Sequence, residues 1–119
     1  MRTILVSALL LTAFACGVDQ SYFEREIEGE WFGQEWLREG QPTGYRAWMK
    51  FEPADSSYRA VFNENLEAGT YWIDGNRLYT HADGSQPIKV RIESIENDIM
   101  TIGMNRGGQS ETITFSRKQ

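Results

Sequence analysis

The sequence predicts an all-β fold: an eight-stranded antiparallel up-and-down β-barrel preceded by a short N-terminal helix. Two observations carry this prediction. After residue 29, apolar and polar residues alternate along short segments, and turn-forming residues recur about every ten positions. The connections between these segments are short, which favours strands that pair in chain order. A meander of eight strands can close into a barrel and so remove its exposed edges.

The N-terminal segment has the pattern of an export signal. Arg2 supplies a positive charge, residues 4–14 form an apolar run of 11 residues, and Ala13 and Ala15 are the small residues that a signal peptidase reads. The run is well short of the roughly 20 residues that a membrane-spanning helix needs. We therefore expect residues 1–15 to be a signal peptide that is removed.

Cys16 directly follows this cleavage signature and is the only Cys in the chain. Residues 13–16 resemble a bacterial lipobox, in which the Cys is acylated after cleavage, although Ala13 stands where Leu is commonest. We expect Cys16 to carry a lipid anchor and residues 16–20 to form a tether at the membrane. Gly17, rather than Asp, follows the Cys, which by the same resemblance favours the outer membrane. The alternative is plain secretion with a free thiol at Cys16.

Composition bounds what the exported part can be. Removal of the leader leaves 104 residues, enough for one domain over residues 21–119 with a modest core. The whole chain has a net charge of −5, which argues against nucleic acid as a partner. A single Cys allows no disulfide within the chain, so the 4 Trp, 5 Tyr and 6 Phe must supply the core.

Residues 22–28 are expected to form one or two turns of helix before the first strand. Ser21 and Glu24 have the spacing of a capping box. Phe23 and Ile27 are four residues apart and would share one face. The alternative is an acidic linker, because seven residues alone are too few for a stable helix in water.

Turn-forming residues divide residues 30–117 into the expected strands. Gly, Gln, Pro, Thr and Gly at 40–44 end the first strand, a Pro-containing loop follows at 52–56, and residues 64–67 turn the chain again. Asp-Gly-Asn at 74–76 is a tight-turn signal. The eight expected strands cover residues 30–38, 45–51, 57–63, 68–74, 77–81, 87–93, 100–104 and 109–117.

Alternation within these segments supports the strand assignment. In residues 45–51, the apolar residues at odd positions would share one face. The clearest case is residues 88–93, where Ile, Val and Ile alternate with Lys, Arg and Glu, after Pro87 at a tolerable strand start. In the last segment Ile113 and Phe115 share a face. We expect these apolar faces to line the inside of the barrel.

Four short segments together give a family resemblance. They are Gly-Glu-Trp at 29–31, Met-Lys-Phe at 49–51, Gly-Thr-Tyr-Trp-Ile-Asp-Gly-Asn-Arg-Leu at 69–78 and Thr-Phe-Ser-Arg at 114–117. Over residues 27–117 the chain resembles the small bacterial lipocalin-like lipoproteins. The resemblance implies a signal peptide, a lipidated Cys and a compact β-barrel.

The resemblance also implies a closure of the barrel. Trp31 would lie at the closed end, with Arg117 of the last strand over its ring. A guanidinium stacked on an indole is worth ~0.5–2 kcal/mol, and the pair would join the first strand to the last. The alternative is an ordinary core Trp31 and a solvated Arg117. Strands of about seven residues span only ~23 Å, so any cavity would be small.

The sequence gives little support for catalysis. His81 is the only His, and it lies at a strand end beside a polar loop. Nucleophilic catalysis by Ser or Cys needs a positioned base, and metal sites need clustered ligands at set spacings. Neither pattern is present in the sequence. We expect no enzyme activity, no metal and no cofactor.

The first function that the sequence suggests is binding of a small apolar ligand in the barrel mouth. The candidate lining residues are Met49, Tyr58, Phe62 and Tyr71, which lie on apolar faces of their strands. An eight-stranded barrel is just wide enough to be filled by side chains or to hold one small ligand. The protein would then be a membrane-anchored binding lipoprotein of the cell envelope.

The alternative function is interaction with, or inhibition of, another envelope protein. Trp36, Trp48 and Trp72 fall on the polar side of their strands and, with the acidic loops, would face a basic partner. The competing explanation is that these rings pack under loops, since single exposed apolar residues are normal. The sequence alone does not choose between the two functions.

Overall fold

The structure is a computed structural model, and it describes residues 20–117. The expected signal peptide and the expected lipidation site at Cys16 lie outside the described residues. A helix over residues 20–26 precedes the strands. The strands are β1 (Gly29–Arg38), β2 (Gln41–Pro42), β3 (Ala47–Glu52), β4 (Ser57–Phe62), β5 (Asn65–Asp74), β6 (Arg77–Ala82), β7 (Ile88–Glu96), β8 (Ile99–Arg106) and β9 (Gln109–Ser116).

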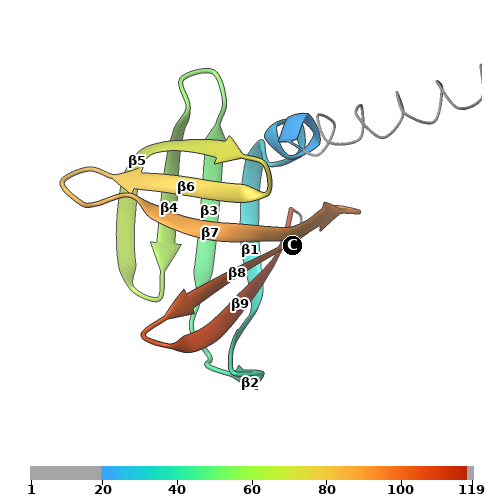
Figure 1. Ribbon diagram of the computed structural model, residues 1–119, viewed down its shortest axis with the longest axis vertical. Coiled ribbons are helices and arrows are strands. Elements are labelled where there is room, and N and C mark those ends of the chain that lie inside the picture. Colours follow the sequence, from blue (N-terminus) through green and yellow to red (C-terminus); the bar gives the residue numbers. More distant parts are fainter. Residues whose placement is uncertain (1–19, 118–119) are drawn as a thin grey trace, which may run out of the picture.

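Eight of these strands form a closed antiparallel barrel (Figure 1). From β3 to β9 each strand pairs with the next in chain order, and β1 pairs with both β3 and β9. The short β2 pairs only with the end of β1 and is an addition to the barrel. The predicted all-β, eight-stranded up-and-down barrel with a short helix is therefore confirmed.

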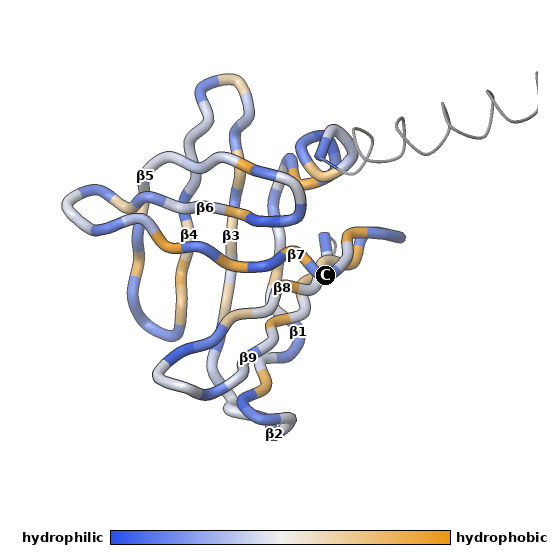
Figure 2. The backbone as a smooth tube through the Cα atoms, viewed as in Figure 1, coloured by the Kyte–Doolittle hydropathy of each residue, from blue (hydrophilic) through white to orange (hydrophobic). Residues whose placement is uncertain are grey.

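The core lies inside the barrel and is built from alternate residues of each strand. Figure 2 shows hydrophobic and hydrophilic residues alternating along strands such as β7. The largest fully buried side chains include four aromatic rings from four different strands: Trp31, Phe51, Tyr58 and Phe115. Burial of each is worth roughly 1.5–3 kcal/mol, so these rings account for much of the stability of a chain without disulfides.

The helix lies two residues earlier than expected and packs against one end of the barrel. It already includes Ser21, so Ser21 is not its N-cap and the expected capping box is wrong. The hydroxyl of Tyr22 donates to the carbonyl of Ile95 at 2.5 Å, and the backbone N–H of Gly75 donates to Gln20 at 3.0 Å. These tertiary contacts hold a helix too short to be stable alone.

The two ends of the barrel differ. The helix and the β3–β4, β5–β6 and β7–β8 turns gather at one end, which we call the closed end (Figure 1). The β4–β5 and β8–β9 turns and the β6–β7 loop lie at the other end, which we call the mouth. The chain therefore enters the barrel at its closed end, and the helix over residues 20–26 lies away from the mouth.

A β-bulge in β1 overturns the expected position of one tryptophan. The pairing of β1 with β9 shifts by one residue between Gly33 and Glu35. Such a shift moves every later side chain to the opposite face of the sheet. Trp31 and Trp36 therefore both point inward, and Trp36 is only 5% exposed. The prediction that Trp36 belongs to an exposed interaction surface is wrong.

Candidate functional site

The mouth opens into a cavity of about 330 Å³ inside the barrel. This mouth cavity has a mainly apolar wall made by residues from seven strands, among them Trp36, Met49, Phe62, Leu78, Val90, Ile102 and Met104. Polar side chains of Glu67, Thr80 and Arg106 also reach it. An apolar pocket with a few polar groups is the usual form of a small-molecule site.

Of the four predicted ligand-lining residues, the structure brings two to the mouth cavity. Met49 and Phe62 line it, whereas Tyr58 and Tyr71 do not. Tyr58 is 1% exposed and packs deeper in the barrel, and Tyr71 packs against Phe51 with ring centroids 4.9 Å apart. All four lie on inward faces as expected. Alternation along a strand predicts the face of a side chain but not its depth.

Glu111 is the only charged residue buried in the described core, and it is held by three donors. Trp36 Nε1 donates to Glu111 Oε1 at 2.8 Å, and Arg38 Nε donates to Oε2 at 2.9 Å. Arg106 Nη1 lies 3.5 Å from Oε1. Burial acts to raise the pKa of Glu111, but the hydrogen bonds and the two arginine charges outweigh burial, so the pKa is lowered.

Glu67 is the second inward-facing carboxylate, and its surroundings are different. It lies on β5, opposite Ala60 of β4, and its Oε2 accepts a hydrogen bond from the hydroxyl of Tyr58 at 2.5 Å. Burial raises the pKa of Tyr58, and the hydrogen bond to Glu67 raises it further. Tyr58 therefore stays neutral and serves as a donor beneath the mouth cavity.

The closed end is fastened by Trp31 and Arg117. The guanidinium carbon of Arg117 lies 4.2 Å from the centroid of the Trp31 ring, in the stacked position that the resemblance implies. Arg117 also donates to the carbonyls of Glu26 and Glu28, at 2.6 and 3.0 Å, and its Nε lies 3.3 Å from Asp98. This pair lies at the opposite end of the barrel from the mouth cavity.

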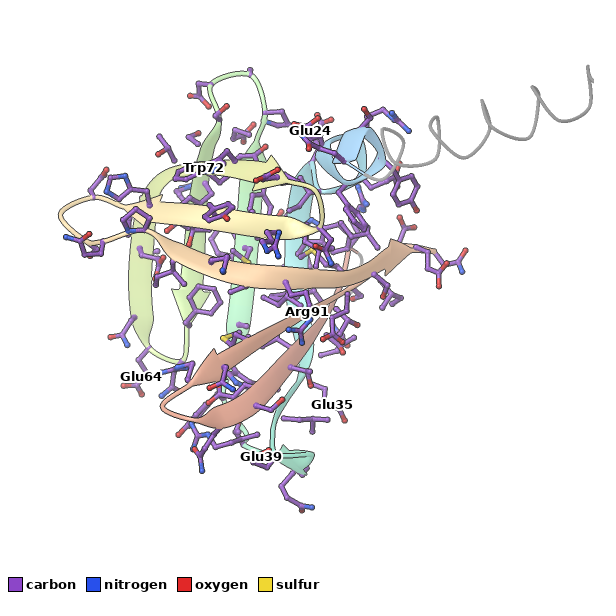
Figure 3. All side chains as sticks on the ribbon, in the orientation of Figure 1. Glu24, Glu35, Glu39, Glu64, Trp72 and Arg91 are labelled. Carbon is purple, nitrogen blue, oxygen red and sulfur yellow. The ribbon has the colours of Figure 1, made fainter. Side chains whose placement is uncertain are left out.

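The other two predicted surface tryptophans do lie on the outside of the barrel. Trp48 is partly buried, and its Nε1 donates to Glu30 at 2.8 Å. Trp72, which is labelled in Figure 3, is 45% exposed. It stacks on Tyr79 with ring centroids 5.1 Å apart. They do not form one patch with Trp36, because Trp36 is inside.

The sequence reasoning missed the charged groups at the mouth. Glu111, Ile113 and Phe115 occupy every second position of β9 and so share one face, which means that the inward direction of Glu111 was readable from the sequence. Glu67 was assigned to a turn at 64–67, but β5 begins at Asn65 and makes Glu67 a strand residue. No sequence signal shows that Arg106 would reach the same cavity.

Comparisons with known proteins give no family for this chain. It matches no protein-family model, and a search of curated proteins finds no match. Within residues 20–117 no cluster of three or more His, Cys, Asp or Glu could hold a metal ion. In the same residues, no helix has the length and apolarity needed to cross a membrane.

Proposed function

We propose that this protein is a lipid-anchored, lipocalin-like lipoprotein of the cell envelope that binds a small, largely apolar ligand in its mouth cavity. The observation that carries the proposal is the cavity of about 330 Å³ with its apolar wall. Most of the barrel is filled by rings such as Trp31, Phe51 and Phe115, so the space at the mouth is a local feature of the fold. Lipidation of Cys16 would hold this barrel at a membrane.

The apolar wall supports a ligand that is driven in by the hydrophobic effect. Burial of apolar surface is worth about 25 cal/mol per Å², and part of that gain is offset by the loss of ligand freedom. A small ligand fits a cavity of about 330 Å³, and we expect affinity to rise with the length of its apolar part.

A probe-displacement experiment tests the binding proposal. We expect phenylnaphthylamine, a neutral apolar fluorophore, to brighten on binding, and straight-chain alcohols to displace it. In Val90→Phe the added ring would fill part of the mouth cavity and weaken probe binding at least tenfold. Leu66→Phe is the matched control, because Leu66 is 72% exposed and does not line the cavity.

Circular dichroism and thermal unfolding of both variants would establish that the barrel still forms. Equal probe binding by Val90→Phe and the unchanged protein would contradict the proposal, because the probe would then bind elsewhere.

The interaction hypothesis remains the second candidate, and one observation favours it. Trp72 is a large ring at 45% exposure on the outer face of β5, and the stacked Tyr79 from β6 holds it in place. Rigid exposed aromatic rings are common anchors at protein interfaces. Native mass spectrometry separates the two functions, since a co-purified small mass supports ligand binding and a captured envelope protein supports interaction.

A further inference from the structure

The mouth cavity contains a carboxylate that a purely apolar ligand would leave without a charged partner. Tyr58 donates to Glu67 Oε2, and it is a neutral donor. Among residues 20–117, no Lys, Arg or His lies within ion-pair distance of Glu67. A ligand that displaces water from this wall removes hydration from a charge, which costs free energy unless the ligand supplies a donor.

The wall contributed by β8 carries the opposite charge. Arg106 lines the cavity. Its Nη1 lies 3.5 Å from Glu111 Oε1, but Glu111 also pairs with Arg38 at 2.9 Å, so one carboxylate faces two guanidinium groups. The Arg106 side chain is 56% exposed. This side of the mouth therefore has surplus positive charge.

The topology places these two charges on different walls of the cavity. In the ring of eight strands, β6 and β7 lie between β5, which carries Glu67, and β8, which carries Arg106. Inward side chains of strands three positions apart approach a small barrel cavity from facing sides. The cavity is thus apolar in its middle, negative on one wall and positive on the other.

We propose that the ligand is dipolar: an apolar body with a protonated amine directed at Glu67 and an acidic group directed at Arg106. This inference rests on the proposed binding function and names its ligand class. An amine supplies the cation that Glu67 lacks, and an acidic group completes the pairing of Arg106. A ligand with only one of these groups leaves the other wall unpaired.

Four probes of equal chain length test this inference. They are aminooctanoate, with its amine and carboxylate at opposite ends, and octylamine, octanoate and octanol. We expect aminooctanoate to displace phenylnaphthylamine about tenfold more tightly than octylamine or octanoate, since one charged hydrogen-bonded contact is worth about 1.5 kcal/mol. The measurement is the midpoint of displacement at low salt.

Two substitutions test which residue binds the amine of aminooctanoate and which binds its carboxylate. In Glu67→Gln, aminooctanoate should bind no better than octanoate, because the amine has lost its partner. In Arg106→Gln, it should bind no better than octylamine. Glu64→Gln and Arg91→Gln make the same charge changes outside the cavity (Figure 3) and should keep the original order.

The outcomes separate the inference from the binding proposal. If octanol, octanoate or octylamine binds the unchanged protein as tightly as aminooctanoate, the dipolar ligand class is wrong while binding of apolar molecules stands. If none of the four displaces the fluorophore, both proposals fail. If Glu64→Gln lowers aminooctanoate binding as much as Glu67→Gln, the effect is one of net charge and the assignment to Glu67 is wrong.

Discussion

Glu111 shows how one buried charge can be kept ionised inside a small barrel. Its two oxygens accept from Trp36 and Arg38, and Arg106 adds a second positive charge nearby. The side chain of Glu111 is 1% exposed, so water contributes little to its solvation. Removing one partner of such a buried ion pair destabilises the fold by more than the intact pair stabilises it, because the remaining charge is then buried without compensation.

Glu111→Gln should therefore lower the free energy of unfolding at pH 7 by about 1–3 kcal/mol. The pKa of Glu111 is lower in the folded protein than the ordinary value of 4.5. Its stabilisation is thus fully present above that value and is lost as the pH falls through the folded pKa. Urea unfolding between pH 7 and pH 3 should show a smaller loss of stability in Glu111→Gln than in the unchanged protein.

Glu35→Gln is the control for this pH series, since Glu35 is exposed on the same strand as Arg38 (Figure 3). Its pH dependence should match that of the unchanged protein. Identical pH dependence in Glu111→Gln would show that the Glu111 contacts do not stabilise the fold.

At the scale of residues, the sequence predicted directions better than contacts. The inward faces of Met49, Tyr58 and Phe115 follow from alternation with period two. Trp36 was misplaced because a bulge depends on the pairing of β1 with β9, two strands far apart in sequence. The contact of Trp36 with Glu111 depends on that same bulge, so local patterns could not reveal it.

At the scale of elements, Arg117 joins three parts of the structure. Its guanidinium stacks on Trp31 of β1, donates to the carbonyls of Glu26 and Glu28, and lies beside Asp98 of the β7–β8 turn. The carbonyls at a helix C-terminus carry partial negative charge and lack helical partners, so a cation there is favourable. The short helix and the barrel closure therefore depend on the same side chain.

We expect Arg117→Ala to lower the free energy of unfolding by about 2–4 kcal/mol, from the lost cation–π contact and two lost hydrogen bonds. Arg117→Lys should recover less than half of this loss, because an ammonium cannot stack as a plane or donate in a fork. Denaturant unfolding measures both values. Full recovery by Lys would show that charge alone matters at this position.

The sequence predicted the existence of the helix and the strands better than it predicted the residues at which they begin and end. The eight barrel strands follow from regular alternation and turn residues, and the structure confirms them. The helix was placed two residues late, because contacts of Tyr22 and Gln20 with the barrel help to position it, and such tertiary contacts are not readable from a local pattern. The pairing of β2 with the end of β1 was likewise not readable from a two-residue segment.

At the scale of the whole molecule, the mouth and the helix that follows the proposed anchor lie at opposite ends of the barrel. The helix begins within four residues of Cys16, a span of at most about 14 Å. Because the helix packs at the closed end, a lipid on Cys16 would bring that end to the membrane. The mouth cavity would then face away from the bilayer and receive its ligand from the aqueous side.

This orientation predicts a difference between two labelled variants on vesicles. A fluorophore on Ala54→Cys, in the β3–β4 turn of the closed end, should be quenched strongly by spin-labelled lipid headgroups. The same fluorophore on Glu64→Cys, in the β4–β5 turn of the mouth, should be quenched weakly. Adding Cys16→Ser should abolish membrane partition and both signals. Stronger quenching at position 64 would contradict the orientation.

The pairing of β1 with β9 also decides when folding can be completed. These strands lie at opposite ends of the described chain, and each forms one side of the last seam of the barrel. A contact between residues so far apart in sequence forms late, because the intervening loop must first be closed at a cost in chain entropy. During synthesis the seam cannot form until the final strand has left the ribosome. For a chain exported as proposed, this delay would keep the polypeptide unfolded long enough to thread through a translocation pore.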